Sequence, residues 1–105
     1  MVIITKTTLE KFARIRPEVA EQLNNWHTIT KKASWRNFAA IKQSFNSVDS
    51  VGNGRFCFNI KGNEFRLIVL ILFQTRTVFI LWLGTHSEYD RLNKVTGAAN
   101  VVYKS

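Results

Sequence analysis

The chain has only one cysteine, Cys57, so it cannot form an internal disulfide. It also has only one proline among 105 residues, and no stretch has the composition of an interdomain linker. Its 46% hydrophobic content, which includes 8 Phe and 3 Trp, is enough for one core. We therefore expect a single domain that covers residues 1–105.

Long apolar segments are also missing from the sequence. Residues 1–6 lack the apolar segment of a signal peptide. The longest apolar runs, 67–73 and 78–83, are far shorter than the roughly 18 residues that cross a bilayer. These runs are typical of buried strands, and we expect a cytoplasmic protein with no membrane contact.

Acidic side chains are scarce, because 7 Asp and Glu accompany 15 Lys and Arg and the formal net charge is +8. Such a surface attracts polyanions, so nucleic acid is the first partner to consider. An acidic protein partner fits the charge equally well, and many small proteins are basic without using the charge for binding. Charge alone leaves these alternatives open.

The N-terminal half has the spacing of helices, after a β-branched start at residues 2–4. Thr7 and Glu10 have capping-box spacing and predict a helix over about residues 9–16. Pro17 suits the first turn of a second helix. The apolar residues that this second helix would turn inward are Val19, Leu23, Trp26 and Ile29.

Ser34 is predicted to cap a third helix, because apolar residues recur at helical spacing after it. These residues are Trp35, Phe38, Ile41 and Phe45. Aromatic residues at helical spacing are mostly packing residues, so Trp26 and Trp35 are assigned to the core. A platform on which RNA bases stack is the alternative for either tryptophan.

The period changes from helix to strand after residues 46–54, which are rich in Asn, Ser, Asp and Gly. In residues 55–61 apolar and polar side chains alternate, so one face belongs to the core and one is open. Gly62 and Asn63 suit a two-residue hairpin loop, which fixes a register. The predicted pairs are Lys61 with Glu64, Asn59 with Arg66, Cys57 with Ile68, Ile60 with Phe65, Phe58 with Leu67, and Phe56 with Val69.

A second hairpin is predicted to turn at Thr75 and Arg76. It would pair Ile71 with Ile80, Leu70 with Leu81 and Arg66 with Thr85. Residues 87–93 are predicted as a short turn or helical segment that folds Tyr89 back over the strand ends. The open face would then gather polar side chains at one end, namely Asn59, Lys61, Arg66, His86 and Tyr89.

This predicted cluster contains no Cys pair and no carboxylates at ligand spacing, so we expect neither a structural zinc nor a two-metal nuclease site. No cofactor is predicted. RNA carries its own nucleophile, the 2′-hydroxyl, and basic and phenolic side chains can position the backbone, move protons and stabilise the phosphorane. Structural roles are the alternative: Asn59 and Arg66 as a cross-strand pair, His86 as a cap, and Lys61 with Glu64 as an exposed ion pair.

Five short motifs follow one another between Trp35 and Asp90. They are Trp35-x-x-Phe38, Ser47-x-Asp49, Phe58-Asn59-Ile60, Gly62-Asn63-x-Phe65-Arg66-Leu67 and Thr85-His86-x-Glu88-Tyr89-Asp90. Taken together and in this order, they resemble the HigB toxins of bacterial toxin-antitoxin pairs, within the RelE-like superfamily.

The resemblance implies an α+β, RelE-like fold in which N-terminal helices pack on one face of an antiparallel sheet. It also implies an endoribonuclease that cleaves mRNA on the translating ribosome and a helix-turn-helix antitoxin of the HigA type, with DNA reached only through that antitoxin. Carried over by motif, the expected catalytic residues are Asn59, Arg66, His86, Tyr89 and Asp90. The expected RNA contacts are Arg55, Lys61 and Asn63.

The rest of the predicted open face is more apolar than the resemblance leads us to expect. It would hold Ile68, Leu70, Leu72, Phe79, Leu81 and Leu83. We expect the C-terminal residues 95–103, which include Val101, Val102 and Tyr103, to return as an edge strand or to pack there. An antitoxin segment and self-association are the other candidates.

Two rival functions remain compatible with the sequence. A non-catalytic RNA-binding or ribosome-associated module would need only the positive charge and the sheet face, and it would bind RNA without cleaving it. A pure interaction protein would act through a repressor partner and use its charge to attract acidic protein segments.

Overall fold

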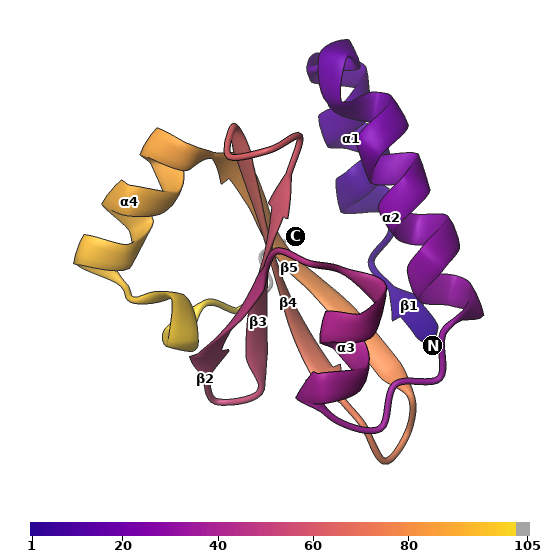
Figure 1. The fold of residues 1–105 in the computed structure, drawn as a ribbon. Helices are drawn as coiled ribbons and strands as arrows, with labels where there is room; N and C mark the ends of the chain where they lie inside the picture. Colours follow the sequence, from indigo (N-terminus) through magenta and orange to yellow (C-terminus); the bar gives the residue numbers. More distant parts are fainter. Residues whose placement is uncertain (103–105) are drawn as a thin grey trace.

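A five-stranded sheet lies at the centre of the protein and separates two groups of helices (Figure 1). The computed structural model describes residues 1–102. The strands are β1 (Val2–Ile4), β2 (Val48–Gly52), β3 (Arg55–Ile60), β4 (Phe65–Leu72) and β5 (Thr77–Thr85). Their spatial order is β1-β5-β4-β3-β2, and only β1 runs parallel to its neighbour. The α+β class is confirmed, but the sheet is mixed because β1 joins it.

The N-terminal helices α1 (Thr7–Ile15) and α2 (Ala20–Lys32) cover one face of the sheet. The predicted capping box is wrong, since Lys6 is the N-cap of α1 and no side chain caps this end. Pro17 was predicted in the first turn of the second helix, but it begins a separate 3-10 turn (Pro17–Val19) that connects α1 to α2. Three of the four predicted inward residues of this segment are buried, namely Val19, Leu23 and Trp26.

Aromatic packing dominates the core beneath these helices. Trp26 and Trp35 are 1% and 2% exposed, which confirms them as core residues. Both rings pack against Phe45 and Phe58, with centroid separations between 5.4 and 6.5 Å. The third helix is shorter than predicted: α3 (Phe38–Ser44) is capped by the side chain of Asn37 and not by Ser34.

The first hairpin has the predicted register. Asn59 pairs with Arg66, Phe58 with Leu67 and Cys57 with Ile68, and the predicted pairs of Ile60 with Phe65 and Phe56 with Val69 are also present, whereas Lys61 and Glu64 lie in the loop. The loop spans residues 61–64, with Lys61 as well as Gly62 at positive φ. The polar run before this hairpin was predicted as irregular, but it contains the edge strand β2, which pairs with β3.

The second hairpin differs from the prediction. Ile71 pairs with Val78 and not with Ile80, because the loop spans residues 73–76. A β-bulge then adds one residue to β5: Ile80 pairs with Val69 and Trp82 pairs with Ile68. The bulge reverses the alternation of β5 beyond Leu81.

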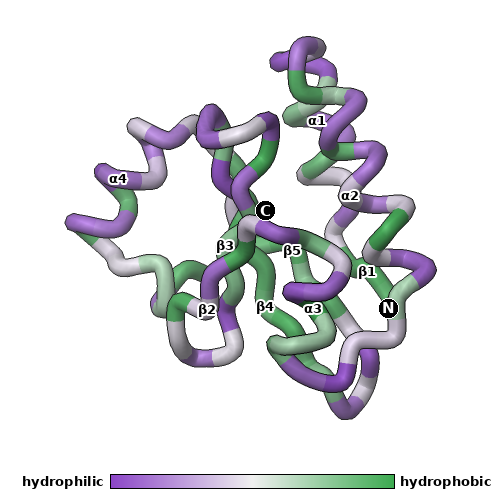
Figure 2. The backbone as a smooth tube through the Cα atoms, in the orientation of Figure 1, coloured by the Kyte–Doolittle hydropathy of each residue, from purple (hydrophilic) through white to green (hydrophobic). Residues whose placement is uncertain are grey.

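Because of this reversal, the residues on the open face differ from those predicted. Leu83 packs against the main core beneath the N-terminal helices, whereas Leu81 and Trp82 pack on the opposite side of the sheet. The hydropathy view shows strongly apolar β3 and β4 beside a largely hydrophilic α4 (His86–Val95) (Figure 2). Only part of α4 is therefore suited to contact the sheet.

The C-terminal segment covers the second face of the sheet. Gly97, at a φ of 84°, ends α4 and is followed by a 3-10 turn at Ala98–Asn100. Ala98 and Val101 are buried against Cys57 and Ile68. Packing of this segment on the apolar face is thus confirmed for Ala98 and Val101 but not for Val95 and Val102, which are exposed, and Tyr103 lies outside the described residues.

Arg55 fastens this segment to the sheet. Its Nε and Nη2 donate hydrogen bonds to the carbonyl oxygen of Val101 at 3.2 and 3.1 Å, and its Nη1 donates to Asn53 at 2.8 Å. Asn53 in turn donates to the carbonyl oxygen of Ala99.

Within residues 1–102, no helix combines the length and the apolar character that a membrane span requires.

Replacing Gly84 with alanine should destabilise the fold. The new Cβ would lie 2.6 Å from the ring of Trp82, which must then shift. We expect a loss of about 1–3 kcal/mol in the free energy of unfolding, measured with urea. The same change in a Trp82→Leu background should cost less, and an equal cost in both backgrounds would contradict the steric explanation.

Replacing Arg55 with alanine should loosen the C-terminal segment, because two hydrogen bonds to Val101 disappear. We expect faster amide hydrogen exchange in residues 98–101 and a loss of about 1 kcal/mol in unfolding free energy. Arg14→Ala removes the same charge from the exposed surface of α1 and should change neither quantity. Unchanged exchange in the Arg55 variant would show that the segment is held by apolar contacts alone.

Candidate active site

The candidate site lies where the first hairpin meets the start of α4. Asn59, near the end of β3, faces Arg66, near the start of β4. Arg66 has Gly84 as its partner on β5, and the ring of Trp82 lies against this glycine. The next residue, Thr85, is both the last residue of β5 and the N-cap of α4.

Arg66 is held by backbone groups and by a tyrosine ring. Its Nη1 donates hydrogen bonds to the carbonyl oxygens of Asn63 and Phe65, at 3.1 and 3.3 Å. Its Cζ lies 5.9 Å from the centre of the Tyr89 ring, within the range of a cation–π contact. Nε and Nη2 make no hydrogen bond to residues 1–102, so this fixed cation can bind an anion.

Tyr89 is a half-buried side chain of the site. Its ring lies between Arg66 and Trp82, whose ring centre is 6.2 Å away. Burial is the main reason that the pKa of Tyr89 is raised to about 12, and the neighbouring Cys57 raises this pKa further. The phenol is therefore protonated at neutral pH and can donate a proton.

Two asparagines order the hairpin loop. The Asn59 side chain donates to Ser47 Oγ and, at 3.5 Å, to Asn63 Oδ1. The carbonyl oxygen of Asn63 accepts the hydrogen bond from Arg66 described above. Ser47 was part of a recognised motif but had no predicted role, and its contact with Asn59 depends on the edge strand that the sequence did not reveal.

His86 and Asp90 form a second pair on the solvent side of α4. Nε2 of His86 lies 3.3 Å from Oδ2 of Asp90, with both side chains about half exposed. His86 does not cap the helix: Thr85 accepts from the Glu88 backbone, and the Glu88 side chain accepts from the Thr85 backbone. The backbone hydrogen bond from Thr85 also lowers the pKa of Glu88.

The remaining predicted residues lie further from the centre of the site. Nζ of Lys61 is 3.5 Å from Oε2 of Glu64, in an exposed ion pair at the tip of the hairpin. Arg55 is at the other end of β3, opposite Leu70, and its guanidinium group is engaged with the C-terminal segment. Its predicted RNA contact stays a prediction, while the structure gives it a clear task in packing.

Sequence reasoning missed two residues that shape the site. Trp82 was overlooked because the bulge that turns it toward Tyr89 leaves no sign in a regular alternation. Cys57 was placed on the correct face, and Tyr89 was expected to fold back over the strand ends, but the apolar cluster in which the two residues meet was not predicted. Asp49, on β2, pairs with Cys57, and its negative charge also raises the pKa of Tyr89.

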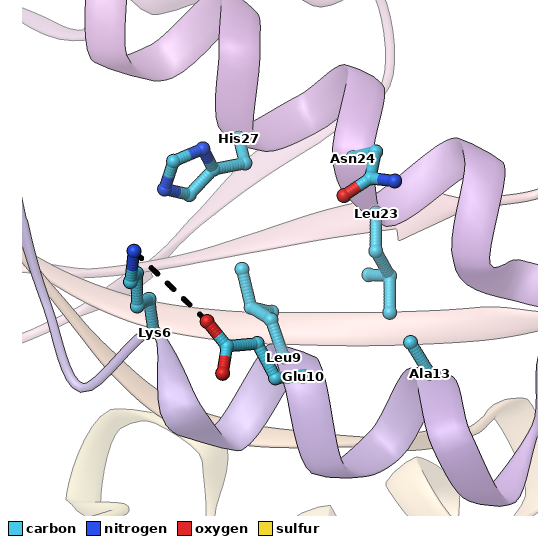
Figure 3. Close-up of a pocket in the computed structure, with 7 residues that line it drawn as sticks. All are labelled: Lys6, Leu9, Glu10, Ala13, Leu23, Asn24 and His27. Carbon is cyan, nitrogen blue, oxygen red and sulfur yellow. Dashed lines mark ion pairs between the residues drawn. The ribbon is translucent and has the colours of Figure 1, made fainter.

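A pocket of about 370 Å³ lies on the other side of the sheet, between α1 and α2 (Figure 3). Its floor is apolar, and its rim carries the Lys6–Glu10 ion pair and His27. Burial, followed by the charges of Lys6 and Lys31, lowers the pKa of His27. None of the predicted site residues lines this pocket.

Titratable groups suited to metal binding are dispersed in this fold. Nowhere in residues 1–102 do three or more His, Cys, Asp or Glu side chains gather closely enough to hold a metal ion. The guanidinium group of Arg66 has a phenol and two amides near it, and the imidazole and carboxylate of the His86–Asp90 pair follow on the solvent side of α4. This set can bind a phosphodiester and transfer protons.

Comparison with known proteins identifies the family of this chain. Residues 19–92, which include all of the candidate site, match the family of HigB toxins, described as the RelE-like toxic component of a toxin-antitoxin system. An "mRNA interferase HigB" of Escherichia coli is 27% identical over 96 residues, which are 90% of this chain and 93% of the relative. The "mRNA interferase HigB" of Shigella flexneri is 27% identical over 92 residues, which are 86% and 88% of the two chains. The chain therefore belongs to the HigB toxin family, a RelE-like group of toxic components of toxin-antitoxin systems.

Proposed function

We propose that this protein is an endoribonuclease that cleaves mRNA on the translating ribosome without a metal ion. The names of its relatives, which are mRNA interferases, support the activity. The observation that carries the proposal is the fixed guanidinium group of Arg66, held beside the protonated phenol of Tyr89. A cation and a proton donor are the two groups that cleavage of a phosphodiester most needs.

The proposed reaction uses the RNA itself as the nucleophile. The 2′-oxygen forms a bond to the adjacent phosphorus, and the bond from phosphorus to the 5′-oxygen breaks. Arg66 stabilises the negative charge of the phosphorane, and Tyr89 gives its proton to the leaving 5′-oxygen. The products are a 2′,3′-cyclic phosphate and a 5′-hydroxyl end.

The imidazole of His86 removes the proton from the 2′-hydroxyl in this scheme. Asp90, whose Oδ2 lies 3.3 Å from His86 Nε2, orients the ring. Asn59 and Asn63 hold the loop and the substrate backbone, and Lys61 contributes charge at the hairpin tip. Because such residues act together, their single contributions do not add.

The wider setting follows from family membership. As the toxic component of a toxin-antitoxin system, the protein pairs with an antitoxin. We propose a helix-turn-helix antitoxin of the HigA type, through which DNA is reached only indirectly. We further propose that the chain acts as one domain in the cytoplasm, where its net charge of +8 favours contact with ribosomal RNA and mRNA.

Replacing Arg66 with alanine should abolish most of the activity, because the charge developing on the phosphorane loses its stabilising cation. We expect cleavage of ribosome-bound mRNA to fall by roughly 10²–10³-fold, measured by mapping 5′ ends after addition of the purified protein. Arg14→Ala is the matched control, since it removes an exposed arginine from α1 on the other side of the sheet.

The same experiment separates cleavage from mere binding. A folded wild-type protein that binds ribosomes and produces no new 5′-hydroxyl ends would favour the non-catalytic RNA-binding module instead. Full cleavage by a folded Arg66→Ala variant would refute the assignment of this arginine but not the nuclease activity.

Replacing Tyr89 with phenylalanine should lower the cleavage rate by roughly 10²-fold, with the same factor at every pH between 6.5 and 8.5. The reason is that a pKa of about 12 keeps the phenol protonated throughout this range. The measurement is the single-turnover rate of both proteins against pH. If the wild-type rate divided by the Tyr89→Phe rate rose about tenfold per pH unit, Tyr89 would be acting as a base.

A further inference from the structure

Ser47 lies between α3 and the edge strand β2, directly before the first residue of that strand. Its side chain is exposed, but its neighbours along the chain are anchored in the core. The ring of Phe45, two residues earlier, packs against three aromatic rings of the core. Val48, the next residue, is 2% exposed. Ser47 is therefore a surface residue whose backbone is held in place from both sides.

Two hydrogen bonds join Ser47 to Asn59. The backbone N–H of Asn59 donates to the carbonyl oxygen of Ser47 at 3.1 Å, which continues the pairing of β2 with β3 by one residue. The side chain of Asn59 donates from Nδ2 to Ser47 Oγ. The first bond fixes the distance between the two residues, and the second holds the side-chain amide.

The same amide group reaches the hairpin loop. Nδ2 carries two hydrogens, so Asn59 can donate to Ser47 and, at 3.5 Å, to Asn63 Oδ1 at the same time. A hydrogen bond of this length is weak, and a small rotation of the amide breaks it. The carbonyl oxygen of Asn63 accepts from Arg66 Nη1 at 3.1 Å. A chain of contacts thus runs from Ser47 through the two asparagines to the guanidinium group.

We propose that Ser47 is a positioning residue, whose hydroxyl group fixes the Asn59 amide and, through Asn63, keeps the Arg66 guanidinium group where the phosphorane forms. This inference rests on the proposed nuclease function, in which Arg66 stabilises the developing charge. Such stabilisation depends on the position of the cation, and a displacement of about 1 Å is enough to slow a reaction strongly. Ser47 makes no contact with the RNA in this scheme, so its loss lowers kcat and leaves KM unchanged.

The other contacts of Arg66 limit the size of this effect. Its Nη1 also donates to the carbonyl oxygen of Phe65 at 3.3 Å, and the ring of Tyr89 lies 5.9 Å from its Cζ. Both contacts remain when the hydroxyl group of Ser47 is removed. The guanidinium group is then loosened but not released, and the loss of rate is smaller than in Arg66→Ala.

The first test compares Ser47→Ala, which removes the hydroxyl group, with Ser47→Thr, which keeps it. We expect Ser47→Ala to lower kcat for cleavage of ribosome-bound mRNA by about 3–10-fold with an unchanged KM. Ser47→Thr should retain at least half of the wild-type kcat. Ser50→Ala is the matched control, because it removes an exposed hydroxyl group from β2 and should leave kcat unchanged.

The second test asks whether Ser47 acts through Asn59. In an Asn59→Ala background the amide that the hydroxyl group holds is gone, so Ser47→Ala should cause no further loss. The double variant should therefore have the kcat of Asn59→Ala alone. A further 3–10-fold loss in the double variant would show that Ser47 acts by another route, and it would overturn the proposed chain of contacts.

The third test does not require activity. In proton–nitrogen NMR spectra, the side-chain amide signals of Asn59 are those missing from Asn59→Ala. We expect these amide hydrogens to exchange faster with water in Ser47→Ala than in wild type, because Ser47 Oγ no longer accepts one of them. The exchange rates in Ser47→Thr and Ser50→Ala should stay close to the wild-type value.

The outcomes separate this inference from the proposed function. A wild-type kcat in Ser47→Ala, or an equal loss in Ser47→Ala and Ser47→Thr, would overturn the positioning role. Unchanged exchange of the Asn59 amide in Ser47→Ala would overturn the contact itself. If the wild-type protein cleaves no RNA, the nuclease proposal fails, while the NMR result still decides whether Ser47 holds Asn59. Should Ser47→Ala fail to fold, Ser47→Gly removes the same hydroxyl group and replaces it in all three tests.

Discussion

The extra residue in β5 determines which side chains the sheet presents to each of its faces. Before the bulge at Leu81, the alternation of β5 turns Val78 and Ile80 toward the N-terminal helices. Beyond it, Leu83 returns to that core while Trp82 faces α4. A strand with regular alternation could not do both, and Tyr89 would lose the ring that supports it. The bulge therefore connects the packing of the core with the geometry of the candidate site.

The parts of the fold that the sequence predicted well are those where the local pattern of apolar and polar residues allows only one arrangement. The register of the first hairpin brings Phe58 against Leu67 and Asn59 against Arg66, and a slip would reverse every one of these environments. Trp26 and Trp35 were placed in the core for a similar reason, because large apolar rings have few other stable positions.

The features that the sequence did not reveal depend on contacts between distant segments. The capping-box spacing of Thr7 and Glu10 is matched by that of Thr85 and Glu88, yet only the second pair forms the motif, because a strand delivers Thr85 in the extended conformation that a cap requires. Likewise, β2 becomes a strand only because the edge of β3 is available to it. The grouping of Arg66 with Tyr89 could be predicted from motifs, but the contribution of Trp82 could not.

The direct passage from β5 into α4 has a consequence for how this region can vary. Thr85 ends the strand and caps the helix, so no connecting residue lies between the two elements. Inserting a single amino acid there would rotate every following side chain by about 100° around the helix axis. Tyr89 would then leave Arg66, and His86 and Asp90 would turn away together. Insertions and deletions are thus far more costly at this junction than substitutions. Residues in this region can be replaced, but the number of residues between Thr85 and Tyr89 has to stay the same.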